Sequence, residues 1–88
     1  MSLEKSSIEQ TIKNKVIELV SALGDDASEL GPDEIIPATG LIDSAALLEL
    51  IAWYEHHFKL KLAPDEISID NLGSLSRMAD FVLARSGR

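Results

Sequence analysis

The sequence contains no cysteine. Disulfide bonds and a protein thiol nucleophile are therefore excluded, and the redox compartment cannot be inferred from cysteine usage. The sequence also lacks a membrane-spanning apolar run, and Met1-Ser2-Leu3-Glu4-Lys5 has no signal-peptide core, so we expect a cytoplasmic protein without membrane insertion.

Basic residues are scarce. Eight Lys and Arg stand against 15 Asp and Glu, which gives a formal net charge of −7. This balance disfavours nucleic acid and anionic membranes as partners, since both attract clustered Lys and Arg. It favours protein partners with basic docking faces, although an acidic surface also serves solubility alone.

The length of 88 residues predicts one domain, 1–88, with a thin core. Few prolines and glycines, together with helix-period apolar patterns, predict an all-α fold: a small antiparallel bundle of three main helices plus a short helix, with a long first loop. We expect a monomer. The expected elements are a helix at about 6–23, a loop at 24–43, a helix at about 44–58, a short helical turn at about 64–68 and a helix at about 74–86.

Local signals place the ends of these elements. Ser6 and Glu9 have capping-box spacing and Gly24 suits a helix stop. Ser74 is the expected cap of the last helix. The apolar stripe of the first helix consists of Ile8, Ile12, Val16, Leu19, Val20 and Leu23, and that of the last of Leu75, Met78, Ala79 and Val82, with Phe81 at its edge.

The long first loop is expected to contain a helical turn at Pro32-Asp33-Glu34-Ile35. Leu30, Ile35, Ile36, Leu41 and Ile42 are its expected anchors on the bundle. The later stretch 59–63 alternates with period two, but no partner strand exists, so we interpret it as a loop with inward-pointing leucines.

Two possible helix caps, Asp43 and Ser44, stand in a row before an apolar-periodic segment. One helix needs one cap. If Asp43 caps, Ser44 is the first helical residue, and a phosphate on its hydroxyl would lie near the positive end of the helix dipole. On the residues alone, simple capping is the more common use of such a serine.

The helix at 44–58 has two apolar stripes. Leu47, Leu50, Ile51, Tyr54 and Phe58 are the expected core stripe. Ala45, Leu48 and Ala52 lie on the opposite side, among Glu49, Glu55 and His56. The second stripe indicates either a docking surface or a helix buried on most sides, and the wheel does not separate these alternatives.

Catalysis and metal binding find little support in the sequence. His56 and His57 point about 100° apart on a helix and no third ligand follows with suitable spacing. Both lie three turns from Ser44, too far to serve as its base. We therefore expect no metal site, no catalytic residue and no enzyme.

Asp43-Ser44-Ala45, the helix after it, Phe58-Lys59-Leu60 and Leu72-Gly73-Ser74-Leu75 together resemble an acyl carrier protein over nearly the whole chain. The resemblance implies 4′-phosphopantetheine, derived from coenzyme A, on Ser44, with Asp43 presenting it. It implies an acyl or aminoacyl thioester as cargo. A phosphopantetheinyl transferase, a loading ligase and a downstream acyltransferase or synthase are the implied partners, docking on Ala45, Leu48, Glu49, Ala52, Glu55 and His56.

Two departures refine the resemblance. Ala45 stands where the common motif has Leu, and His56 and His57 stand where carriers of fatty acid synthesis often have Glu. These favour a stand-alone carrier similar to D-alanyl, aminoacyl or peptidyl carriers, and the bulky Trp53 and Tyr54 favour short or aminoacyl cargo. The alternative is an unmodified helical adaptor that binds a protein through the same surface.

Overall fold

The computed structural model describes residues 4–40 and 42–85, apart from the side chains of Pro37 and Ser44. Every regular element in these residues is helical, so the all-α prediction is confirmed. The elements are α1 (Lys5–Ala22), the 3-10 helix η1 (Ile36–Thr39), α2 (Ser44–His57), the 3-10 helix η2 (Pro64–Glu66), α3 (Ile69–Leu72) and α4 (Leu75–Arg85).

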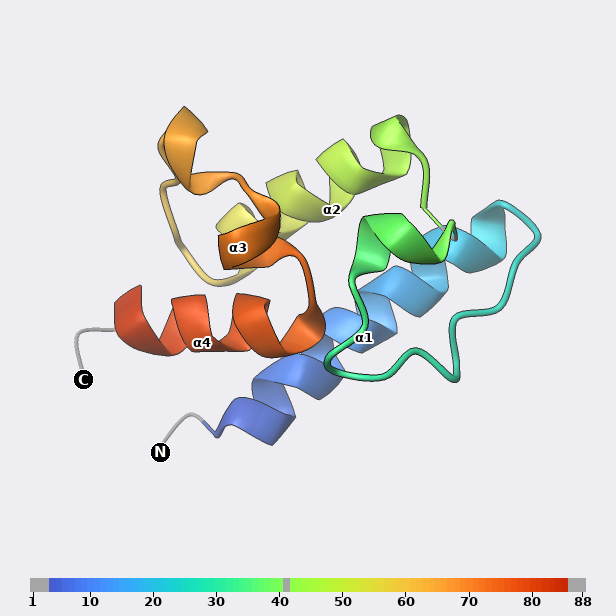
Figure 1. The fold of residues 1–88 in the computed structure, drawn as a ribbon, viewed down its shortest axis with the longest axis horizontal. Helices are drawn as coiled ribbons and strands as arrows, with labels where there is room; N and C mark the ends of the chain where they lie inside the picture. The colour runs from blue at the N-terminus through green and yellow to red at the C-terminus, as the bar shows by residue number, and fades with distance from the viewer. Residues whose placement is uncertain (1–3, 41, 86–88) are drawn as a thin grey trace.

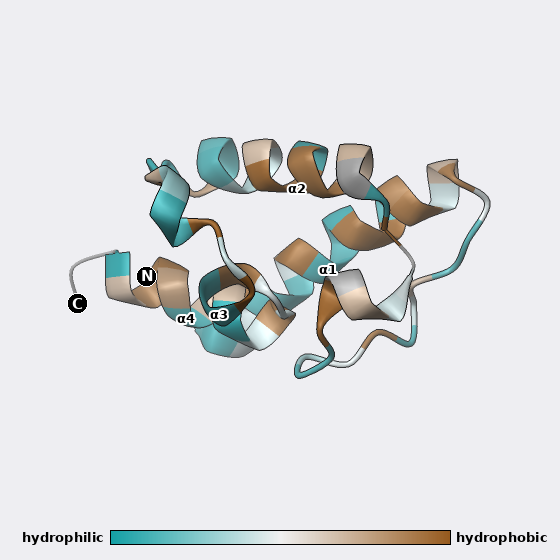
Figure 2. Cartoon of the chain, turned by 45° about the horizontal axis from the view of Figure 1, so that its top comes forward, coloured by the Kyte–Doolittle hydropathy of each residue, from teal (hydrophilic) through white to brown (hydrophobic). Residues whose placement is uncertain are grey.

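The helix α1 is the element on which the others pack. Both α2 and α4 run back against its direction and contact it, while α3 packs on α4 (Figure 1). In the turned view of Figure 2, α2 lies along the top of the molecule, and α3 and α4 lie together below it. Within the described residues, no helix combines the length and the apolarity needed to cross a membrane.

The buried core comes mostly from the predicted stripes, but Ala46 is buried without having been predicted, and Leu47 and Phe58 of the predicted stripe are only half-buried. The buried residues of the long helices are Ile8, Ile12, Val16, Leu19 and Val20 of α1, Ala46, Leu50, Ile51 and Tyr54 of α2, and Leu75, Met78, Ala79 and Val82 of α4. Leu23 was expected to join them but is 50% exposed, because α1 ends at Ala22 and Leu23 is its C-cap.

The N-terminus of α1 differs from the prediction. Ser6 is not its cap: the N–H of Ile8 bonds to the carbonyl oxygen of Glu4 (3.0 Å), so the first turn closes before Ser6 could cap it. The predicted stop at Gly24 is confirmed. Gly24 has φ of 87°, and the N–H groups of Gly24 and Asp25 bond to the carbonyls of Ser21 and Val20 in a Schellman motif.

The first loop is anchored to the bundle by its buried apolar residues Leu30, Ile36 and Ile42.

The prediction of a helical turn at Pro32 is wrong. Residues 31–34 make an isolated turn, and the helical segment is η1, four residues later. The reason is tertiary: the N–H of Ile36 bonds to the carbonyl of Gly73 (2.7 Å), which fixes the chain at the start of η1. Leu41, another expected anchor, lies outside the described residues.

The connection between α2 and α4 is an irregular loop followed by η2 and α3. No strand forms at 59–63, as expected, and Leu60 and Leu62 are half-buried against the core. The helix α3 (Ile69–Leu72) was not predicted from the sequence. Its N-cap is Ser68, whose hydroxyl accepts a hydrogen bond from the N–H of Asn71 (3.3 Å).

Ser74 caps α4 as predicted. Its hydroxyl accepts a hydrogen bond from the N–H of Arg77 (3.2 Å).

Tyr54 links α2 to α4 through the core. Its side chain is fully buried, and its hydroxyl donates a hydrogen bond to the carbonyl oxygen of Met78 (2.7 Å). Burial raises the pKa of this hydroxyl above the usual value for tyrosine.

We predict that Tyr54→Phe lowers the free energy of unfolding by about 1 kcal/mol near neutral pH, because the buried bond to Met78 is lost. The difference from the parent protein should shrink above about pH 10. There Tyr54 ionises in the unfolded chain but stays protonated in the folded one, because burial raises its pKa, so the parent protein loses stability and the Phe variant does not. Urea unfolding at neutral and alkaline pH measures both effects. A difference that stays constant with pH would contradict the burial argument.

Candidate functional site

The start of α2 is capped by Asp43. This residue is in an extended conformation (φ −90°, ψ 180°), and its Oδ1 accepts a hydrogen bond from the N–H of Ala46 (2.8 Å). Its carbonyl oxygen accepts the first helical bond, from Leu47 (2.9 Å). Of the two adjacent candidates for the cap, Asp43 is therefore the one that caps α2, and Ser44 is the first residue of the helix. The Ser44 hydroxyl, on which the sequence prediction centres, lies outside the described atoms.

The chain before Asp43 is held to the α3–α4 junction at the start of η1 and four residues before it. The N–H of Ile36 bonds to the carbonyl of Gly73, and the N–H of Ser76 bonds to the carbonyl of Pro32 (2.9 Å). After η1 the chain turns at Gly40, which has φ of 76°, a conformation that suits glycine. The position of residue 44 is therefore fixed from two directions, by the α3–α4 junction and by α2 itself.

The outer face of α2 is open to solvent. Ala45, Leu48, Glu49, Ala52 and His56, five of the six predicted docking residues, are all exposed. Leu48 is 66% exposed, more than any other large hydrophobic residue that the structure describes. The alternative of a helix buried on most sides is therefore wrong.

The sixth predicted docking residue, Glu55, is used within the fold. It is half-buried, and its Oε2 accepts a hydrogen bond from the N–H of Leu62 (3.0 Å). This bond attaches the loop after α2 to the helix. Glu55 is therefore less available to an outside cation than the exposed Glu49.

The two histidines differ in their surroundings. The His57 ring stacks on Trp53 with a centroid distance of 4.8 Å and an interplanar angle of 21°, whereas His56 makes no ring contact within the described residues. No group of three or more His, Asp or Glu in the described part of the chain could hold a metal ion.

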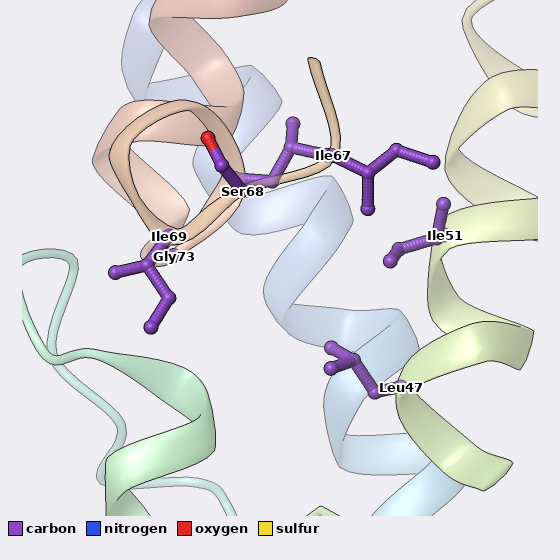
Figure 3. A pocket seen from close by; sticks show the side chains of 7 residues that line it. Leu47, Ile51, Ile67, Ser68, Ile69 and Gly73 are labelled. Carbon is purple, nitrogen blue, oxygen red and sulfur yellow. The ribbon is translucent and has the colours of Figure 1, made fainter. Parts of the chain in front are cut away.

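An apolar groove lies between α2 and α3. It has a volume of about 170 Å³ and is lined by Leu47, Ile51, Ile67, Ser68, Ile69, Leu72 and Gly73. Ile67 points toward Ile51 from the opposite wall (Figure 3). Leu47 lies one helical turn after residue 44, so the groove begins close to the start of α2.

Sequence reasoning missed this groove because it missed α3. A helix of four residues shows no apolar period, and Ile67 and Ile69 lie in a stretch where only a short turn was expected. The available signal was the N-cap pattern of Ser68, with Asp70 in the first turn of α3.

The chain matches the model of a known family. A family model described as "Phosphopantetheine attachment site" matches residues 14–82, from within α1 into α4. The match includes Asp43, Ser44 and all of α2. A search of curated proteins and a search of solved structures gave no match.

We predict that Asp43→Ala lowers the free energy of unfolding by about 1 kcal/mol, because the N–H of Ala46 loses its acceptor. Asp43→Ser retains a short oxygen side chain and should recover most of this loss. Chemical unfolding followed by circular dichroism measures both variants. Equal stability of Asp43→Ala and the parent would show that the cap contributes nothing.

Proposed function

This chain belongs to the phosphopantetheine attachment site family, and from that membership we propose that it carries an acyl or aminoacyl group on 4′-phosphopantetheine attached to Ser44. The family binds this prosthetic group covalently. The observation that supports Ser44 as the attachment residue is the Asp43 cap: the N–H of Ala46 has its acceptor without the Ser44 hydroxyl.

The residues around position 44 fit such a group. The N-terminus of a helix favours a phosphate, because its first N–H groups and the helix dipole both attract negative charge. The chain has no cysteine, and the group's terminal thiol supplies the sulfur on which an acyl or aminoacyl cargo is held as a thioester. Asp43 holds the helix start in place, and the exposed Ala45 beside it leaves room for an incoming enzyme.

The exposed face of α2 is the proposed docking surface. Ala45, Leu48 and Ala52 would provide apolar contact, and Glu49 and His56 would provide polar contact at the rim. The net charge of −7 favours encounter with basic faces on a phosphopantetheinyl transferase, a loading ligase and a downstream acyltransferase or synthase. In this role the chain presents a substrate to enzymes and is not itself an enzyme.

The proposed cargo is short or aminoacyl. Tyr54 fills the interior below α2, and among the described residues the groove offers room for an apolar group next to α2. Its volume of about 170 Å³ is close to that of a protein cavity of about 150 Å³ that accommodates benzene. Together with Ala45, His56 and His57, which depart from the fatty acid synthesis pattern, this supports a specialised carrier similar to D-alanyl, aminoacyl or peptidyl carriers.

The test is modification by a broad-specificity phosphopantetheinyl transferase. After incubation with coenzyme A, the intact mass of the chain should rise by one phosphopantetheine. Ser44→Ala should abolish the gain. Ser68→Ala is the matched control, since Ser68 is another serine at the start of a helix beside the groove, and this variant should still be modified.

The alternative function is that of an unmodified helical adaptor, which the exposed Leu48 would also suit. It predicts no mass gain under conditions that modify a known carrier. A gain that persists in Ser44→Ala would contradict the assignment of the attachment residue while leaving the carrier function in place.

A further inference from the structure

Residues 64–72, which comprise η2 and α3 and are called the strap here, form one wall of the apolar groove. Two apolar strap residues are exposed to water: Ile67 is 42% exposed and Ile69 is 54% exposed. Leu47 and Ile51 form the facing wall on α2 (Figure 3). Because water disfavours apolar surface, movement of the strap onto α2 would be favourable unless other contacts oppose it.

The contacts that oppose it run to α4. Arg85 pairs with Glu66 at one end of the strap and also donates to the carbonyl oxygen of Lys61 (3.3 Å). Arg77 donates to the carbonyl oxygen of Ile69 (3.2 Å). Within the described residues, the strap makes no hydrogen bond or ion pair with α2.

The pair of Arg85 and Glu66 is the most substantial of these contacts. Glu66 is half-buried, the side chains of Arg85 and Glu66 are 36% and 28% exposed, and the Arg85 guanidinium lies 4.7 Å from the centroid of the Phe81 ring. The ring restricts the arginine to the orientation in which it meets Glu66. By contrast, Asp70, which faces Arg77 at 3.6 Å, is 97% exposed, and solvent screens that pair.

The strap has a fixed point at each end. Before it, the side chain of Glu55 on α2 holds the N–H of Leu62. After it, the carbonyl of Gly73 holds the N–H of Ile36. Gly73 has no room for a side chain, since a Cβ atom there would lie 2.4 Å from the carbonyl oxygen of Ile69.

We propose that the Glu66–Arg85 ion pair is a clasp that holds the strap against α4 and keeps the groove open. Release of the clasp lets the strap close onto α2 and bury Ile67 and Ile69 against Leu47 and Ile51. On the proposed function, the clasp controls how much apolar shelter is present one helical turn from the attachment residue. The movement itself requires no modification of Ser44.

The absence of cysteine allows a direct test on the unmodified chain. Ile51→Cys and Ile67→Cys place one thiol on each wall, and the rate of intramolecular disulfide formation under a mild oxidant reports closure. Adding Glu66→Gln should raise this rate about threefold, as expected from loss of one partly exposed ion pair. Gln can still accept from the N–H of Ala63, so the start of η2 is preserved.

The matched control is Asp80→Asn, which breaks the ion pair of Lys5 with Asp80 (3.1 Å) on α4 but leaves the strap contacts intact. Its cross-linking rate should not change. Salt at about 1 M should accelerate cross-linking in the parent cysteine pair and have little effect in Glu66→Gln. An unchanged or slower rate in Glu66→Gln, or the same response to salt in both proteins, would overturn the clasp. Because Ser44 is unmodified throughout, this result is independent of the transferase assay.

Discussion

The hydrogen bond from the N–H of Ala46 to Asp43 is the contact on which the arrangement of the site depends. It decides which residue is the first of α2. Had Ser44 taken the cap, the helix would begin one residue later, and the hydroxyl would be engaged in capping. With Asp43 as the cap, residue 44 lies inside the first turn, where the helix dipole favours an anionic group.

The rest of the fold keeps that helix start in place. The first loop is attached to the α3–α4 junction through Ile36 and Gly73, and α2 is attached to α4 through the buried Tyr54. Because the inner stripe of α2 holds the helix on the core, its outer stripe of Ala45, Leu48 and Ala52 is not needed for packing and remains exposed. A helix attached on one side and open on the other suits a protein that several enzymes must recognise.

Much of this could be predicted from the sequence because it depends on local chemistry. The apolar period located α1, α2 and α4, and the short oxygen side chains located the caps at Asp43 and Ser74. The failed predictions for the first loop and for Glu55 depend on contacts between distant residues, whereas the failed cap at Ser6 and the exposure of Leu23 are local to the ends of α1. The bond from Ile36 to Gly73 places η1 four residues beyond the turn that Pro32 suggested, and α3 is too short to show a period. Glu55 looked like a surface acid, and only the fold brings the N–H of Leu62 to it.

The central claim is a division of roles, in which Asp43 serves the fold and Ser44 serves the prosthetic group. The stability of Ser44→Ala tests it most directly, by urea unfolding beside the parent protein. The account predicts a free energy of unfolding within about 0.5 kcal/mol of the parent, as for a substitution away from any structural contact. A loss of about 1 kcal/mol or more, the size of a lost cap, would show that the fold uses the Ser44 hydroxyl and would contradict the account.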